Sequence, residues 1–446
     1  RRAGDLQIHE LAQDVIARLA PRAVSPEPLI DLCRRLVRLP CTSGNRVQLL
    51  INGDETFASM LAEIAGATDY ILVEFFIVHR DRIGNAFKDA LMAKAREGVR
   101  VYFLFDALGS RTLPASYVHE LREAGVQVSS FRSTRGWRRR LQINFRNHRK
   151  IAIIDGRSLF LGGLNVGDEY MGRSRRFGYW RDTHLKLEGP AVQCAQLAFL
   201  EDWYWARREI PDLQWEPGVA AACDTAVMVL PTGPADDVAA CEMAHIACIN
   251  SASRRLWITS PYFVPDPPTV VALKLAVLRG VDVRIMLPDR PDHLMVYLSS
   301  FSFYQEMLPA GVKLYRFQPG FMHQKVMLID DRWAAVGTAN LDNRSFVLHF
   351  EITALLGGQR IVREVGEVLE EDFGCCREVT MDAYLARPIW FRAAVRVARP
   401  SAPVQAPGCG ALRSRRPRPW REGGGPGLPQ GAPARSQRAR RPRLRD

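Results

Sequence analysis

Two histidine–lysine pairs carry the chemistry that this sequence suggests. His148 and Lys150 are two positions apart, and His323 and Lys325 have the same spacing. An imidazole can act as a nucleophile or as a general acid and base near neutral pH. Two ammonium groups suit the non-bridging oxygens of a phosphate. Because a single His-x-Lys on a strand is common, this interpretation depends on both pairs forming one site.

The two pairs belong to an internal repeat. Residues 147–165, NHRKIAIIDGRSLFLGGLN, align without a gap on residues 322–340, MHQKVMLIDDRWAAVGTAN. The segments share His, Lys, Ile, Asp, Arg, Gly and Asn at matching positions. Shorter stretches with weaker similarity precede both segments in the same order. The chain therefore contains two diverged copies of one unit. The matched polar positions are His148 and His323, Lys150 and Lys325, Asp155 and Asp330, and Asn165 and Asn340.

We expect one pocket between the two copies. Residues i and i+2 of a strand point to the same face, so each His and Lys should project together. A pseudo-twofold axis would bring both pairs into a shared site, where Asn165 and Asn340 could add amide donors. One imidazole would attack phosphorus to form a phosphohistidine, and the other would protonate the leaving alkoxide. No Cys, His and Asp residues have metal-ligand spacing, so we expect no metal and no cofactor.

The acidic residues near the motifs are expected to have supporting roles. Asp155 and Asp330 are counted with the catalytic set, but their position at a strand end favours support of the turn or charge balance. A nucleophilic His also needs a partner on its other nitrogen. Asp182 and Glu351, downstream of the two motifs in apolar segments, are the candidates. The alternative is an ordinary ion pair, for instance between Asp182 and Arg181.

The remaining pattern predicts an α/β fold. Strand-like TDYILVEFFIV (68–78), helical NAFKDALMAKAREG (85–98) and strand-like VRVYFLFD (99–106) follow one another. That order is typical of βαβ units in a mixed or parallel sheet. We therefore divide the chain into a helical lead-in at 1–45, a first half at 46–215, a second half at 220–385, a candidate amphipathic interfacial segment at 386–400 and a tail at 401–446.

The tail differs from the rest in composition. It holds 11 Arg, no Lys and two acids, which gives +9 of the total net charge of +13 and leaves only about +4 for the other 400 residues. An Arg-, Pro- and Gly-rich segment buries too little apolar surface to order itself, so we expect disorder. The nine scattered cysteines indicate a reducing compartment, and no apolar stretch is long enough to cross a bilayer.

The doubled motif H-x-K-x4-D-x6-G-[GST]-x-N resembles that of the phospholipase D superfamily. The resemblance covers about residues 46–385 and implies two α/β sandwich halves that share one active site and use a phosphohistidine. Carried over by position, the catalytic residues are His148, Lys150 and Asn165 with their counterparts in the second half. Thr338 stands where Ser is more usual, which keeps a supporting hydroxyl near the phosphate. Either His fits the nucleophile, with His148 preferred.

Segments outside the motif indicate which members of the superfamily the chain resembles. EFFIV, GGLNVGDEY, WRDTHLKLEGPAV, SPYFVPD and GTANLDNRSFVLHFE together resemble bacterial cardiolipin synthases of a short form without N-terminal transmembrane helices. This resemblance implies transfer of a phosphatidyl group to phosphatidylglycerol or a similar alcohol, with release of glycerol or another small alcohol. It also implies a peripheral position on the cytoplasmic side of the bacterial membrane. Aromatic and basic residues at 386–400 favour contact with an anionic membrane surface.

Three other functions fit parts of the pattern. A phospholipase D would hydrolyse the same intermediate to phosphatidic acid, and the chemistry of its pocket would be identical. A nuclease of the superfamily fits the basic tail, but most of the charge lies outside the catalytic body, so we expect no nucleic-acid partner. A non-catalytic lipid-binding protein would not need every chemical residue in both copies. The oligomeric state does not follow from the sequence.

Overall fold

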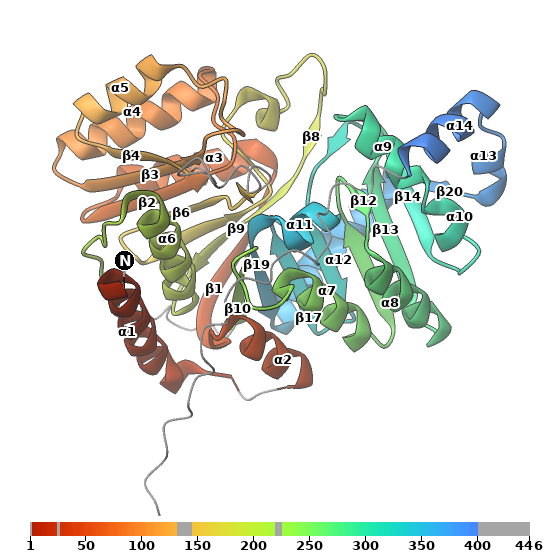
Figure 1. Cartoon of the computed structure of the whole chain (residues 1–446), viewed down its shortest axis with the longest axis horizontal. Helices are drawn as coiled ribbons and strands as arrows, with labels where there is room; N and C mark the ends of the chain where they lie inside the picture. The colour runs from red at the N-terminus through yellow and green to blue at the C-terminus, as the bar shows by residue number, and fades with distance from the viewer. Residues whose placement is uncertain (1, 25–26, 132–144, 219–224, 400–446) are drawn as a thin grey trace, which may run out of the picture. The chain divides into compact units, whose positions relative to one another are not determined.

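The computed structural model describes residues 2–24, 27–131, 145–218 and 225–399 (Figure 1). In this part of the chain the fold is α/β, with a mixed sheet in each of two halves. The first half has the strand order β1-β9-β7-β6-β2-β3-β4. Its strands are β1 (Thr42–Ile51), β2 (Tyr70–Phe75), β3 (Arg100–Asp106), β4 (Gln127–Phe131), β6 (Ile151–Ile154), β7 (Ser158–Gly162) and β9 (Thr183–Glu188).

The second half repeats this arrangement. Its order is β10-β19-β17-β16-β11-β13-β14, followed by an additional edge strand β20. In both halves the last three strands of the shared order run parallel and the others pair antiparallel. The strands are β10 (Thr225–Thr232), β11 (Arg255–Thr259), β13 (Asp282–Pro288), β14 (Lys313–Phe317), β16 (Val326–Ile329), β17 (Trp333–Gly337), β19 (His349–Gly357) and β20 (Cys376–Val379). The prediction of two similar α/β halves is confirmed.

The halves are joined through their first strands and through a common core. β1 and β10 pair antiparallel, with Thr42 opposite Val227. One buried apolar cluster contains side chains from α6 and the first sheet together with side chains from α12 and the second sheet. Each half also has a further apolar cluster beneath its outer helices. Because burial of apolar surface is the main driving force of folding, the shared cluster stabilises the halves as one body.

The helices cover both faces of the sheets, as Figure 1 shows. α3, α4 and α5 pack on the outer face of the first sheet, and α7 and α8 contribute to the apolar cluster of the second. The helices are α1 (Arg2–Leu19), α2 (Pro28–Val37), α3 (Asn52–Ala65), α4 (Arg82–Arg96), α5 (Ala115–Glu123), α6 (Ala191–Arg207), α7 (Ala240–Ser251), α8 (Pro267–Leu278), α9 (Leu294–Phe301), α10 (Tyr304–Met307), α11 (Asn343–Val347), α12 (Gln359–Gly374), α13 (Met381–Leu385) and α14 (Ile389–Ala398). Short 3-10 helices form at η1 (Ala20–Arg22) and η3 (Asp168–Met171).

The expected bounds of three chain segments can be compared with the observed helices and strands. The expected boundary at residue 46 falls inside β1, so the helical lead-in is shorter than 1–45. The segment 386–400 contains α14, whereas the tail at 401–446 lies outside the described residues. Among the described helices, none is long and apolar enough to span a membrane.

The His-x-Lys motifs do not lie within strands, which corrects our expectation. His148 and Lys150 fall between β5 (Arg146–Asn147) and β6, and His323 and Lys325 fall between β15 (Phe321–Met322) and β16. The paired side chains nevertheless stay close, because each lysine folds back to the backbone carbonyl of its own histidine.

The two motif aspartates hold equivalent turns. Asp155 and Asp330 have left-handed φ angles of 52° and 53°, and each follows the end of its strand that is remote from the histidine. Asp155 accepts hydrogen bonds of 2.8–3.0 Å from the backbone N–H groups of Thr68, Asp69 and Tyr70, which lead into β2. Asp330 accepts hydrogen bonds from the N–H groups of Ser253, Arg254 and Arg255, which lead into β11. Their positions fit the expected support of the turn rather than contact with substrate.

We predict that Asp155→Asn lowers the free energy of unfolding by about 2 kcal/mol, because three backbone donors lose an anionic acceptor. Asn tolerates the left-handed backbone, so the change is confined to the charge. Partial burial works to raise the pKa of Asp155, but these amides outweigh it and hold the pKa low. The stabilisation is therefore present above the unfolded pKa and lost as the pH falls, so the variants should converge below about pH 4.

Urea unfolding of wild type, Asp155→Asn and Asp331→Asn checks this prediction. Asp331 is a suitable control because its carboxylate, 53% exposed, bonds only to arginine side chains in the described structure. Exposed pairs of this kind contribute less than about 1 kcal/mol. Equal loss of stability in Asp155→Asn and Asp331→Asn would contradict the assignment.

Candidate active site

Two short parallel strand pairs cross between the halves and position the motif histidines. β5 of the first half pairs with the start of β19, and β15 of the second half pairs with β8 (Trp180–Arg181). The N–H of His148 donates to the carbonyl of Phe350 at 2.9 Å, and the N–H of His323 donates to that of Arg181 at 2.8 Å. Each histidine therefore continues a strand that is bound to the opposite half.

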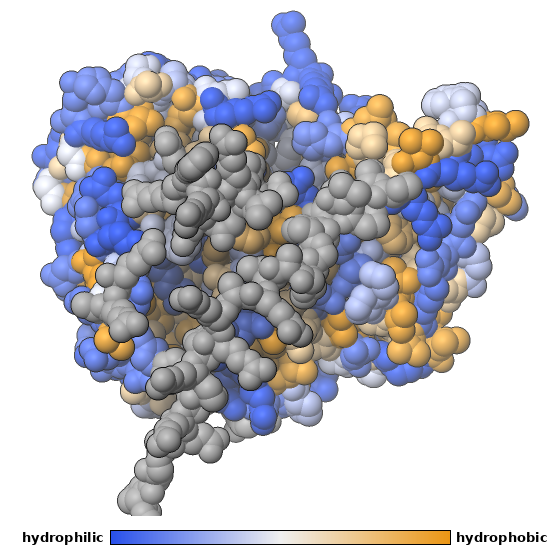
Figure 2. All heavy atoms as spheres, viewed as in Figure 1, coloured by the Kyte–Doolittle hydropathy of each residue, from blue (hydrophilic) through white to orange (hydrophobic). Residues whose placement is uncertain are grey.

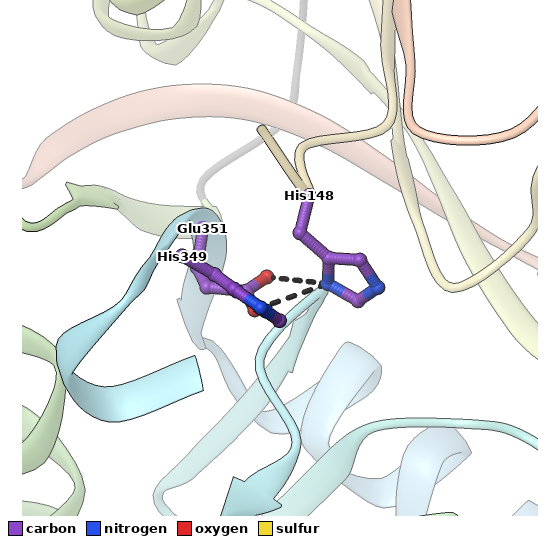
Figure 3. Close-up of side chains that lie close together, drawn as sticks. All are labelled: His148, His349 and Glu351. Atoms are coloured by element: carbon purple, nitrogen blue, oxygen red, sulfur yellow. Dashed lines mark hydrogen bonds and ion pairs between the residues drawn. The ribbon is translucent and has the colours of Figure 1, made fainter. Parts of the chain in front are cut away.

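This crossing pairs each histidine with a carboxylate from the other half. Nδ1 of His148 lies 3.0 and 2.9 Å from the two oxygens of Glu351 (Figure 3). Nδ1 of His323 lies 2.9 Å from Oδ2 of Asp182. Both carboxylates are completely buried. In each case Nδ1–H donates to a carboxylate and Nε2 remains for chemistry.

Asp182 and Glu351 were the expected partners of the histidines, and the structure brings both to an imidazole. Neither acid bonds to the motif histidine of its own half. The alternative of an ion pair between Asp182 and Arg181 is not formed, since Arg181 binds Asp372 at 2.8 Å instead.

Both lysines are buried beside the imidazoles. Nζ of Lys150 donates to the carbonyl of His148 at 2.7 Å, and Nζ of Lys325 lies 3.0 Å from both ring nitrogens of His323. Burial lowers the pKa of Lys150 to about 7 and that of Lys325 to about 8. The charges of Glu351 and Asp182 act in the opposite direction. An anionic ligand would further favour the charged lysines.

Burial also keeps both imidazoles neutral. It lowers the pKa of His148 to about 3 and that of His323 to about 4, and the neighbouring lysines add to the effect. The pKa of Glu351 is lowered despite its burial, because the close contact and hydrogen bond with His148 favour the carboxylate. The site thus combines neutral imidazoles and anionic acids with two lysines whose pKa values burial brings close to neutrality.

The expected amide and hydroxyl donors have specific partners. Oδ1 of Asn165 accepts from the N–H of Ile77 at 3.0 Å, and its Nδ2 donates to Oη of Tyr170 at 3.3 Å. Oδ1 of Asn340 is buried and has no hydrogen-bond partner among the described residues. Oγ1 of Thr338 donates to Glu351 at 2.6 Å. The hydroxyl of Thr338 therefore acts through the carboxylate, whereas the sequence had placed it near the phosphate.

Aromatic rings enclose both histidines. The ring of Phe76 lies 5.0 Å from that of His148, and the ring of Trp180 lies 5.3 Å from that of His323. Trp180 belongs to a small buried cluster with Leu164, Tyr170, Phe177 and Phe321. These walls exclude water from the imidazoles, which strengthens every electrostatic interaction among them.

Sequence reasoning missed one polar residue of the site. His349 begins β19, and its ring centroid lies 5.4 Å from that of His148. Its Nδ1 is 3.5 Å from Oε1 of Glu351. His148, His349 and Glu351 each place one possible metal-ligating atom within 4.8 Å of those of the other two. The spacing did not indicate this group because His148 and Glu351 are 203 positions apart.

The surroundings of both motifs match one family description, and known proteins have similar sequences. A family model described as "Cardiolipin synthase, PLD-like domain" matches residues 60–176 and 245–373. Cardiolipin synthase A of Pseudomonas putida is 48% identical over 373 residues, which cover 83% of this chain and 77% of that protein. Cardiolipin synthase A of Pseudomonas fluorescens is 44% identical over 413 residues, which cover 91% and 85% respectively.

A solved structure supports the fold. Phosphatidylserine synthase of Haemophilus influenzae matches with a TM-score of 0.64 over 85% of this chain and 98% of that one, at 13% identity. A likeness at this identity concerns the fold alone. The matched sequence regions contain both His-x-Lys motifs and Glu351, whereas Asp182 lies between the two regions. The chain belongs to the cardiolipin synthase family with phospholipase D-like domains.

Proposed function

We propose that this protein transfers a phosphatidyl group from one phospholipid to phosphatidylglycerol, or to a similar alcohol, and releases glycerol or another small alcohol. The observation that carries the proposal is the crossed pair of imidazole–carboxylate contacts, His148 with Glu351 and His323 with Asp182. The identity of 48% to relatives named cardiolipin synthase A supports the choice of substrate.

The proposed reaction has two steps. Nε2 of His148 attacks phosphorus, the bond from phosphorus to the glycerol oxygen breaks, and His323 gives that oxygen a proton. In the second step His323 takes the proton of the acceptor hydroxyl, the acceptor oxygen attacks phosphorus, and the P–N bond breaks. Lys150 and Lys325 bind the non-bridging oxygens throughout. Asn165 and Asn340 are proposed to add amide contacts to the same phosphate.

A membrane contact is part of the proposal. α14 buries Phe391 and Val395, whereas Ile389 and Trp390 are 78% and 71% exposed. The hydrophobic residues near α9, α13 and α14 lie at the upper right of Figure 2, beside hydrophilic ones. The arginines that flank the exposed apolar side chains are Arg387, Arg392, Arg396 and Arg399. An apolar edge with basic flanks suits the interface of an anionic bilayer.

The packing of α14 connects this surface to the site. Phe391 meets Phe301 of α9 edge to face, with ring centroids 5.1 Å apart. Asp292, two residues before α9, contributes to the electrostatic environment of Lys325. The N-terminal end of α9 also exposes Leu294 and Met295. We therefore place the lipid surface on the side of the molecule where α9 leaves the active site.

The central test incubates the purified protein with labelled phosphatidylglycerol in vesicles and identifies the products. We expect cardiolipin and glycerol. Phosphatidic acid as the sole product would instead assign a hydrolase, and cleavage of DNA without action on lipid would overturn both. We expect His148→Ala and His323→Ala each to lower turnover about 10⁶-fold, because each removes one reacting group. Substantial activity in either variant would refute the shared site.

We predict that Glu351→Gln lowers kcat by about 10²–10⁴ with little change in KM, because the amide keeps the shape but not the charge that orients His148. The double variant with His148→Ala should be no slower than His148→Ala alone, since both act through one group. Glu367→Gln, at a 65% exposed carboxylate of α12, is the matched control. If the loss of kcat in the double variant equalled the product of the two single losses, Glu351 would act independently of His148.

We predict that Trp390→Asp weakens binding to phosphatidylglycerol vesicles about tenfold or more, because burial of such a side chain contributes about 1.5–3 kcal/mol. Leu278→Asp is the control, since Leu278 is 81% exposed at the end of α8. Vesicle sedimentation measures both variants. Equal weakening by the two substitutions would assign α14 no special role at the membrane.

A further inference from the structure

His349 is a third imidazole beside the reacting groups, and the proposed reaction does not use it. Its side chain is only 10% exposed, and its Nε2 has no hydrogen-bond partner among the described residues. Burial of an unpaired polar group is unfavourable. His349 therefore has a ring nitrogen that no described residue binds and that an external ligand could bind.

The surroundings of His349 match the ligand set of a transition metal. Two imidazoles and one carboxylate, with a fourth position left for water, are common ligands of Zn²⁺. The donor atoms of His148, His349 and Glu351 already lie within 4.8 Å of one another. Figure 3 shows the three side chains converging, with the second nitrogen of His148 on the side away from Glu351.

Among the described residues, no such group surrounds His323 of the other motif. β19 pairs with β5 through His349 and Phe350, and β8 pairs with β15 through Trp180 and Arg181. Trp180 thus occupies beside His323 the place that His349 occupies beside His148. An indole offers no metal ligand. The three-donor group is specific to the histidine that is proposed as the nucleophile.

We propose that His148, His349 and Glu351 form an inhibitory binding site for Zn²⁺ or a similar imidazole-preferring metal. The metal would bind Nδ1 of His148, and the proton of that nitrogen would move to Nε2, so the ring stays neutral. Nε2 then has no lone pair with which to attack phosphorus. The inhibitory effect, but not the binding itself, rests on the proposed role of His148 in phosphatidyl transfer.

The same surroundings limit which metals bind. Mg²⁺ and Ca²⁺ prefer oxygen ligands and would gain little from two imidazoles. Lys150 and Lys325 are buried in the same site and oppose any cation. We therefore expect a reversible inhibitor and not a permanently bound structural ion.

The experiment measures binding without substrate. Tag-free protein is stripped with a chelator, dialysed and titrated with ZnCl₂ in a calorimeter, and Co²⁺ absorption spectra provide a second readout. We expect His349→Asn to weaken Zn²⁺ binding at this site by at least about tenfold, since it removes a ligand. His119→Asn, at a side chain that is 71% exposed, should leave this binding unchanged.

Activity provides the second half of the test. Zn²⁺ should inhibit transfer by the wild type but Mg²⁺ should not, and His349→Asn should stay active and resist Zn²⁺. Wild-type affinity and inhibition in His349→Asn would overturn the proposal. If that variant unfolds, X-ray absorption of the wild-type Zn²⁺ complex decides, because two imidazoles at about 2.0 Å are required. Zn²⁺ binding without any transferase activity would sink the proposed function alone, and transfer without Zn²⁺ binding would sink this site alone.

Discussion

The crossed contacts between the halves are the constraint on which the site depends. Glu351 and Asp182 are fully buried carboxylates, and a buried charge is tolerated only with partners. Glu351 finds them in Nδ1 of His148 and Oγ1 of Thr338, and Asp182 finds them in Nδ1 of His323 and the N–H of Thr183. Separation of the halves would leave both acids without their histidines. The site therefore requires the same union of halves that the shared apolar core stabilises.

The two copies satisfy this constraint with different residues. At the position of Thr338, the first half has Gly163. A Cβ on Gly163 would lie 2.0 Å from Oδ1 of Asp182, so that half has no room for a side chain there. Asp182 instead accepts from the N–H of Thr183 at 2.9 Å. Glu351 has a side chain one methylene longer than that of Asp182, and it uses the hydroxyl of Thr338 as a second donor.

The repeat made much of this architecture predictable. Seven matching residues at constant spacing predicted two α/β halves, and they identified His148 and His323 as one set. The crossing was not predictable, because β5 and β15 are two-residue strands with no periodicity of their own. Asp182 and Glu351 could be named from their apolar surroundings, but which histidine each acid serves depends on that crossing. His349 was missed for a related reason, since its neighbour His148 belongs to the opposite half.

The charges of the buried set connect the structure to the order of the proposed steps. Two carboxylates and two ammonium groups sum to zero when both imidazoles are neutral, and burial lowers the pKa of Lys150 to about 7, so the group carries no net positive charge without substrate. A bound phosphodiester adds one negative charge inside this low-dielectric region, which favours protonation of an imidazole. His323, bound to Asp182, can accept that proton while His148 keeps the lone pair of Nε2. Substrate binding would then create the general acid at the moment when the leaving oxygen requires one.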